Sequence, residues 1–158
     1  MKGKQIGLFC CTVVMAAVLL AGCGTTDDGA KASKPGDSAQ TAVADLGKSK
    51  DGTYTAESSA DDKLGKTDVA ITVRNHKITG VVVKGIDRDG KIKDETYGKN
   101  LGEDRYKRAQ TAYRSMKMYG DDLVKTQSVD AVDAVAGATV SHTQFVEAAR
   151  KALVDAQK

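Results

Sequence analysis

Hydrophobic residues in the first half of the folded part of the chain alternate with polar or small ones. Residues 68–73 carry valine or isoleucine at every second position, and a second apolar run covers 78–86. An Asn-His pair lies between them, and asparagine tolerates the positive φ of a tight hairpin turn. A shorter β-prone stretch, 53–56, follows an Asp-Gly turn. The pattern predicts an antiparallel β-meander.

A helical period follows. One face of a predicted helix between Glu103 and Tyr119 carries apolar residues spaced by three or four, namely Tyr106, Ala109, Tyr113 and Met116. We interpret this stripe as core in preference to the floor of a ligand pocket. Gly120 predicts the end of the helix, and residues 121–136 fit no single element.

A second helix is predicted at the C-terminus. Ser141 and Gln144 have the spacing of a capping box, and Val140 and Phe145 that of a hydrophobic staple. Strands followed by helices predict an α+β fold, in which an N-terminal antiparallel β-meander packs with a mid-chain helix and a C-terminal helix. We assign this domain to residues 51–158.

The first residues have the pattern of an export signal. Residues 1–22 have a basic start, an apolar run of about 15 residues and small residues before Cys23, and about 20 residues are needed to span a bilayer. The ending Leu-Ala-Gly-Cys resembles the bacterial lipobox, which implies a lipid on Cys23 and a protein anchored to the cell membrane, facing outside the cytoplasm. An uncleaved anchor helix is the alternative. Residues 23–50 are polar and small, and we interpret them as the lipidated cysteine and a flexible linker.

Removal of residues 1–22 changes the composition. The net charge of +3 falls to +1 because Lys2 and Lys4 are lost, and no cysteine remains except Cys23. Thiol catalysis, disulfides, iron–sulfur clusters and thiolate zinc sites are thereby excluded. The near-balance of charge argues against a nucleic-acid partner.

Neither a metal site nor catalytic residues are predicted. The two histidines, His76 in the hairpin turn and His142 in the last helix, are expected to be exposed, although His142 could also donate to a bound ligand. Residues 87–90 begin like a calcium loop but lack its later oxygen ligands, which favours a plain turn. The acids are scattered, and we find no serine-nucleophile motif, phosphate-binding glycine loop or dinucleotide fingerprint.

The segment before the last helix carries the candidate chemistry. Gly137 and Ala138 remove side-chain bulk around Thr139, and the free N–H groups of a helix N-terminus suit a phosphate. These residues indicate an anion site or a modified hydroxyl, and a plain small-residue turn is the alternative.

Asp133-x-x-x-Gly137-Ala138-Thr139 before a helix resembles the FMN-binding domain family, as does the start Asp-Gly-Thr-Tyr at residues 51–54. The resemblance implies that a flavin transferase attaches FMN through its phosphate to Thr139. It makes Gly137 and Ala138 the small neighbours and Asp133 the acidic recognition residue. Ala136 stands where the family usually has serine or threonine, and Ser141 begins the helix expected to hold the phosphate.

A second segment resembles the family more weakly. Residues 95–98, Glu-Thr-Tyr-Gly, are similar to a Glu-Thr-Pro-Gly segment near the flavin in larger relatives, with Tyr97 in place of the proline.

The layout resembles single-domain lipoproteins of extracytoplasmic electron transfer. That resemblance implies a membrane-anchored flavoprotein that relays electrons from a membrane-bound reductase or quinol-linked donor to another carrier or an external acceptor. An electron carrier is favoured over a substrate-specific enzyme, because about 105 folded residues leave little room for a second pocket. The alternative is a non-redox surface lipoprotein that binds a ligand or partner without flavin, and Ala136 is its main support.

Overall fold

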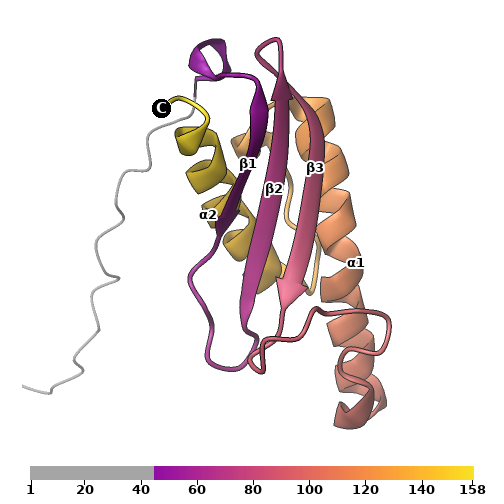
Figure 1. The fold of residues 1–158 in the computed structure, drawn as a ribbon. Coiled ribbons are helices and arrows are strands. Elements are labelled where there is room, and N and C mark those ends of the chain that lie inside the picture. The colour runs from indigo at the N-terminus through magenta and orange to yellow at the C-terminus, as the bar shows by residue number, and fades with distance from the viewer. Residues whose placement is uncertain (1–44) are drawn as a thin grey trace, which may run out of the picture. The chain divides into compact units, whose positions relative to one another are not determined.

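The alternating pattern forms a three-stranded antiparallel sheet in the order β1-β2-β3 (Figure 1). The computed structural model describes residues 45–158, so the predicted signal, Cys23 and most of the predicted linker lie outside the described residues. β1 is Gly52–Glu57, β2 is Lys66–Arg74 and β3 is Lys77–Ile86. The predicted β-meander is therefore confirmed.

The β2–β3 hairpin turns where the sequence predicts it. Asn75 and His76 have φ values of 49° and 60°, the left-handed conformation of both central residues in a type I′ turn. His76 is exposed, and its Nδ1 lies 3.0 Å from the carbonyl oxygen of Ser49.

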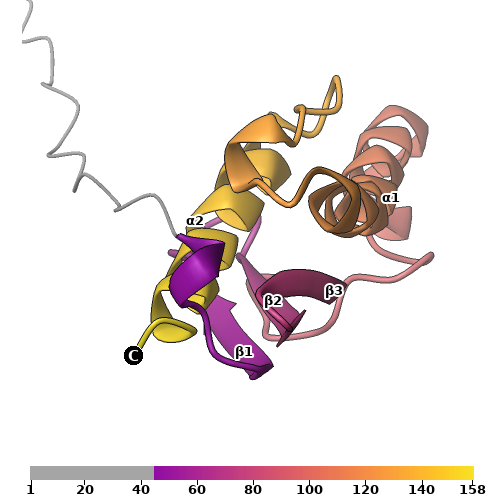
Figure 2. The ribbon, with the colours of Figure 1, turned by 90° about the horizontal axis from the view of Figure 1, so that it is seen from above.

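Two helices cover one face of the sheet, which makes a two-layer α+β domain (Figure 2). α1, Glu103–Thr126, packs mainly on β3, and α2, Thr139–Asp155, packs on β2 and β1. The alternate residues Val69, Ile71 and Val73 are fully buried under the helices. Their burial places the core between the layers, with Tyr119, Leu123 and Phe145 as its largest helical side chains.

The prediction that the mid-chain helix ends at Gly120 is wrong. α1 continues to Thr126, and the buried Gly120 faces Val81 of β3. A Cβ atom at Gly120 would be 3.2 Å from the carbonyl oxygen of Val81, so the glycine permits close packing instead of ending the helix. Gln127, with a φ of 59°, ends α1, and a 3₁₀ turn, Val129–Ala131, follows.

The predicted start of the last helix is also wrong. Ala138 is the N-cap residue of α2, and no side chain in the described part of the chain caps the helix. Ser141 is helical, so it cannot cap. The buried Gln144 accepts a hydrogen bond from the Thr67 hydroxyl at 3.2 Å. Val140 is 43% exposed while Phe145 is fully buried, so the two do not form the predicted staple.

The apolar stripe predicted as core is buried only at one end. Met116 is buried, whereas Tyr106, Ala109 and Tyr113 are half-buried. The end of α1 nearest Glu103 extends beyond the sheet (Figure 1). Core packing therefore comes from the second half of α1.

Residues 45–50, assigned above to the linker, pack on the domain. Asp45 caps a 3₁₀ turn, Leu46–Lys48, and Leu46 contacts the core. The N–H of Lys50 donates to the carbonyl oxygen of Ala156 at 2.8 Å. The ordered fold thus begins before Asp51.

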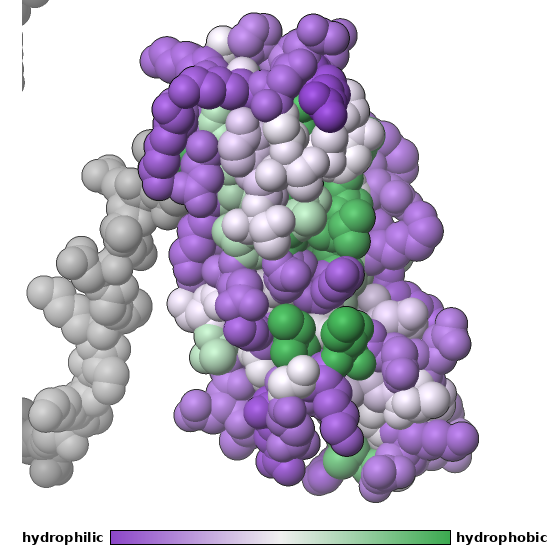
Figure 3. All heavy atoms as spheres, viewed as in Figure 1, coloured by the Kyte–Doolittle hydropathy of each residue, from purple (hydrophilic) through white to green (hydrophobic). Residues whose placement is uncertain are grey.

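No helix of residues 45–158 covers the other face of the sheet. Figure 3 shows this face, where pale and green residues of low polarity interrupt a hydrophilic surface. Ala70 of β2 pairs there with Val82 of β3, which is 55% exposed. Within residues 45–158, no helix is long and apolar enough to cross a membrane.

Candidate functional site

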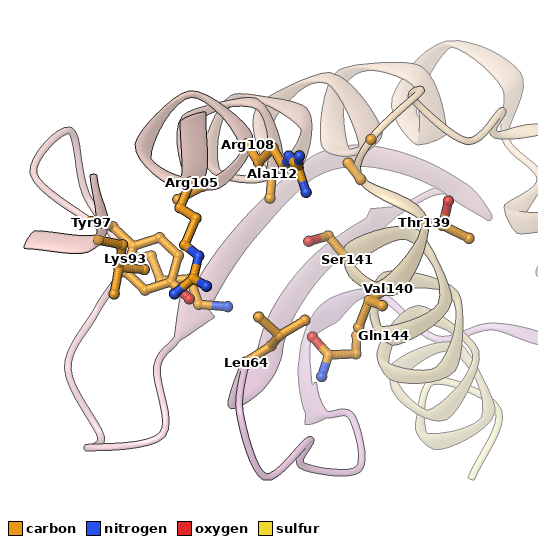
Figure 4. A pocket seen from close by; sticks show the side chains of 14 residues that line it. Leu64, Lys93, Tyr97, Arg105, Arg108, Ala112, Thr139, Val140, Ser141 and Gln144 are labelled. Atoms are coloured by element: carbon orange, nitrogen blue, oxygen red, sulfur yellow. The ribbon is translucent and has the colours of Figure 1, made fainter. Parts of the chain in front are cut away.

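A cavity of about 440 Å³ opens between α1, the start of α2 and the segment that joins β3 to α1 (Figure 4). This volume lies in the range of cavities that bind small molecules. The cavity is lined by Leu64, Lys93, Tyr97, Leu101, Arg105, Arg108, Ala109, Ala112, Gly137, Ala138, Thr139, Val140, Ser141 and Gln144. Most of these side chains are apolar or carry an apolar stem, so the walls suit a largely apolar ligand.

Four of the six cofactor-binding residues predicted from the sequence line this cavity: Gly137, Ala138, Thr139 and Ser141. Thr139 is exposed, as a hydroxyl that an enzyme modifies must be. Ala136 and Asp133 are exposed in the preceding loop and do not line the cavity. The structure thus brings together the end of the motif and leaves its acidic start outside.

The start of α2 presents unpaired N–H groups to the cavity. The first hydrogen bond of the helix runs from the His142 N–H to the carbonyl oxygen of Ala138 at 2.9 Å. Among residues 45–158, no group accepts from the N–H of residues 139, 140 or 141. Such groups, together with the positive end of the helix dipole, bind phosphate well. The missing side-chain cap therefore leaves an anion-binding position beside the Thr139 hydroxyl.

The loop before Thr139 is held in place from both helices. The Tyr119 hydroxyl of α1 accepts a hydrogen bond from the Val135 N–H at 3.2 Å and donates to the Ala138 carbonyl oxygen at 3.3 Å. His142 of α2 donates from Nε2 to the Val132 carbonyl oxygen at 2.8 Å. Gly137 has a φ of +81°, which glycine adopts without strain. These contacts fix the direction in which Thr139 enters α2.

The half-buried His142 is thus not the exposed polar residue that the sequence predicts. Its ring meets the Tyr119 ring edge-on, with 5.3 Å between the ring centroids. His142 therefore positions the loop and does not line the cavity.

The cavity has a cationic wall opposite α2. Lys93, Arg105 and Arg108 line it, and no described carboxylate does. None of the three forms an ion pair with a residue in 45–158. The positive charges and the N–H groups of α2 together favour an anionic ligand.

Tyr97 and Leu101 complete this wall, and the segment that carries them is fixed to α1. The Gln110 side-chain amide donates to the carbonyl oxygens of Asp94 and Tyr97, at 3.2 and 3.0 Å. The Tyr106 hydroxyl donates to the Glu95 carbonyl oxygen at 2.7 Å. Burial raises the pKa of the Tyr97 phenol, so this side chain is neutral at pH 7. The weak sequence similarity at residues 95–98 thus falls on a segment that contributes Tyr97 to the cavity.

Sequence reasoning missed the cations. Arg105 and Arg108 are three residues apart on α1 and share a face with Ala109 and Ala112. Their spacing indicated only that the two arginines share a face, because arginines and alanines are also common on a solvated helix surface. Lys93 gave no comparable signal in the sequence. The described part of the chain contains no group of three or more histidine, cysteine or acidic side chains that could bind a metal ion.

The site can be compared with known proteins. Residues 63–154 match the sequence model of the FMN-binding domain. A protein from Clostridium perfringens with a crystal structure is 28% identical; the similarity covers 69% of this chain and 89% of that chain, with a TM-score of 0.56. A protein from Clostridium thermocellum with a solution NMR structure is 29% identical over 69% of this chain and 93% of that chain, with a TM-score of 0.42.

No curated protein matches the chain significantly. The family match covers more than half of the chain and includes β2, β3, α1, nearly all of α2 and the motif before Thr139, while β1 precedes it. The residues that line the cavity fit a flavin phosphate and an apolar ring. The chain therefore belongs to the FMN-binding domain family and is a flavoprotein by its family.

Proposed function

We propose that the protein carries FMN covalently, as a phosphoester of Thr139, and relays electrons outside the cytoplasmic membrane. The observation that carries this proposal is the exposed Thr139 hydroxyl at an uncapped helix N-terminus, at the edge of a cavity with three cations and no described carboxylate. A phosphoester at this position would retain negative charge, which the N–H groups and arginines stabilise.

The attachment needs FAD and a flavin transferase. The Thr139 oxygen attacks the FMN phosphorus of FAD, the pyrophosphate bond breaks, AMP leaves, and the hydroxyl proton passes to solvent or to a base of the transferase. The exposed Asp133 lies in the same loop, within reach of an enzyme that recognises the motif.

The chain positions the cofactor, and a bound flavin supplies the reversible gain and loss of electrons. The N–H groups of residues 139–141 and the Arg108 guanidinium, which lies nearest Ser141 (Figure 4), would hold the phosphate. Tyr97, Leu101 and Ala109 provide apolar surface for the ring and exclude water from it.

The apolar wall of the cavity reaches the surface. Leu64, Leu101 and Val140 line it and are 40%, 53% and 43% exposed. A redox partner could therefore approach the ring closely. We propose a membrane-bound reductase or quinol-linked donor on one side and another carrier or an external acceptor on the other, with the protein tethered through Cys23.

Co-expression with a flavin transferase tests the attachment. Covalent flavin survives denaturation, so the wild-type band should fluoresce on a denaturing gel, and its mass should increase by one FMN phosphoester. Thr139→Ala should abolish both signals. Thr143→Ala is the matched control, because Thr143 is exposed on the same helix and does not line the cavity. A fluorescent Thr139→Ala band, or a colourless wild-type protein, would contradict the proposal and favour a ligand-binding lipoprotein without flavin.

A further inference from the structure

Lys93 is a buried cation that the proposed attachment does not use. We propose that the Lys93 ammonium is the counter-charge of the reduced flavin ring and raises the reduction potential of the cofactor. This inference rests on the proposed function, because it requires a flavin tethered at Thr139. It assigns a positioning and tuning role to a residue outside the attachment motif.

The stem of Lys93 is fixed by close packing. The Lys93 N–H donates to the Gly85 carbonyl oxygen at 2.8 Å. A Cβ atom at Gly85 would lie 2.7 Å from Cδ of Lys93 and 2.4 Å from Cε of Met116, so the lysine stem occupies the space that this glycine leaves. The residue is only 5% exposed. Its ammonium therefore cannot move freely into solvent.

The ammonium faces the cavity without a matching anion. Lys93 lines the cavity, and its Nζ lies 5.0 Å from the centroid of the Tyr97 ring. Of the described residues, Asp61 and Asp87 are close enough to act on its charge, but neither forms an ion pair with it. An aromatic face compensates a buried charge only partly. Lys93 is thus left with positive charge that a ligand can neutralise.

The placement matches the geometry of a tethered flavin. Lys93 and Tyr97 lie on one side of the cavity and Thr139 on the other (Figure 4). If the ring of a flavin attached at Thr139 occupies the cavity, it would meet the wall formed by Lys93 and Tyr97. Arg108 lies nearer Ser141 in the same view, where the phosphate is expected.

The charge of the ring changes on reduction. The oxidised ring is neutral, and uptake of two electrons and one proton at neutral pH leaves one negative charge, shared between N1 and the neighbouring carbonyl oxygen. The electrons come from a low-potential reductant, which is the proposed reductase in the cell and dithionite in a titration. A fixed cation stabilises the reduced ring more than the oxidised ring and so raises the potential.

Redox titration of the flavinylated protein tests this role. In Lys93→Met, which keeps the length of the stem and removes the charge, we expect the preference for reduced over oxidised flavin to fall at least tenfold. For a two-electron couple, tenfold corresponds to a fall of about 30 mV in midpoint potential. Lys93→Arg should keep the wild-type potential, and Lys93→Gln provides a second neutral variant. Lys91→Met is the matched control, because Lys91 is exposed and does not line the cavity.

Fluorescence on a denaturing gel separates the two proposals. If every variant carries flavin and Lys93→Met and Lys93→Gln titrate at the wild-type potential, the tuning role is wrong and the attachment stands. If the potential of Lys93→Arg falls as far as that of Lys93→Met, the tuning role is also wrong, because the positive charge is kept in Lys93→Arg and a structural role would explain the result. If the wild-type protein carries no flavin, both proposals fail.

Discussion

The Tyr119 hydroxyl donates a hydrogen bond to the carbonyl oxygen of Ala138, the residue directly before Thr139, across 3.3 Å. The same hydroxyl accepts from the N–H of Val135, and Tyr119 itself is fully buried. One core side chain of α1 thus holds both ends of the turn that delivers Thr139. This oxygen atom therefore links the core to the candidate site.

We predict that Tyr119→Phe lowers both stability and flavin attachment. Two partly buried main-chain groups lose their partner, which costs about 1–3 kcal/mol of unfolding free energy. Urea unfolding measures this loss, and gel fluorescence after a short co-expression measures the attachment. Tyr113→Phe is the matched control, because the Tyr113 hydroxyl bonds no residue in 45–158. Equal attachment in Tyr119→Phe and wild type would show that the turn does not need this bond.

Gly137→Ala should strain the turn at a second point. Gly137 has a φ of +81°, and a Cβ atom there would meet only Thr111 Cγ2 at 3.9 Å, so the cost is conformational and not steric. We expect a loss of about 1 kcal/mol in stability and slower flavin attachment.

Gly90→Ala is a control for backbone strain alone. Gly90 has a φ of +80° in an exposed turn with nothing within 4 Å of its Cβ position. This variant should lose similar stability and keep full flavin attachment. If both variants attach flavin at the same rate, the conformation of Gly137 has no role in presenting Thr139.

The strands could be predicted from the sequence because their signal is local. Val69, Ile71 and Val73 face the core by alternation alone, whichever helices cover them. The end of α1 could not be predicted this way, because Gly120 serves a close approach to Val81, a residue about forty positions away. A helix stop and a close-packing glycine have the same local sequence.

The residues of the candidate site likewise fall into those that the local sequence predicts and those that only the fold brings together. Thr139 and its small neighbours are contiguous, so a motif identifies them. Lys93 and Arg105 come from other segments, and only the packing of the β3–α1 connection against α1 places them around the cavity. Ser141 satisfies the capping-box pattern, but its main chain is already helical, and the pattern contains no information on that conformation.

Glu147 should make stability depend on acid pH. Its Oε1 accepts from the Ser59 N–H, the Ser59 hydroxyl and Lys151 Nζ, at 3.0, 2.7 and 2.7 Å. Partial burial raises the pKa of the Glu147 carboxyl, but these hydrogen bonds outweigh it and hold the pKa below its usual range. The ionised Glu147 carboxylate therefore stabilises the fold fully at any pH above its pKa in the unfolded chain, about 4.5. This stabilisation is lost as the pH falls through the lower pKa that the carboxyl has in the folded protein.

Glu147→Gln should therefore be less stable than wild type at pH 7, by about 0.5–1 kcal/mol for mostly exposed bonds. The two proteins should converge in stability below pH 4. Glu103→Gln is the control, because the Glu103 side chain is 80% exposed and, within residues 45–158, forms an ion pair with Lys107 alone. A constant difference between pH 3 and 7 would falsify the assignment to ionisation of Glu147.

Lys93→Met should stabilise the protein when no flavin is attached. Burial lowers the pKa of the Lys93 ammonium, and the carboxylates of Asp87 and Asp61 offset this only in part. The pKa of Lys93 is lower in the folded protein than in the unfolded chain. Below the folded pKa the ammonium is charged in both states, so burying it lowers the free energy of unfolding by the full amount. This cost disappears as the pH rises toward the unfolded pKa of about 10.4.

We expect the flavin-free Lys93→Met variant to exceed wild type in unfolding free energy by about 1 kcal/mol at pH 7. The difference should shrink as the pH rises from 7 toward the unfolded pKa of lysine, and urea unfolding over this range measures it. Lys91→Met should match wild type throughout, since its ammonium is solvated. A flavin-free Lys93→Met protein that is less stable than wild type at pH 7 would mean that the ammonium already has a compensating partner. In that case the charge of Lys93 would already be neutralised before a flavin binds. Lys93 would then no longer lower the stability of the flavin-free protein in exchange for a higher reduction potential.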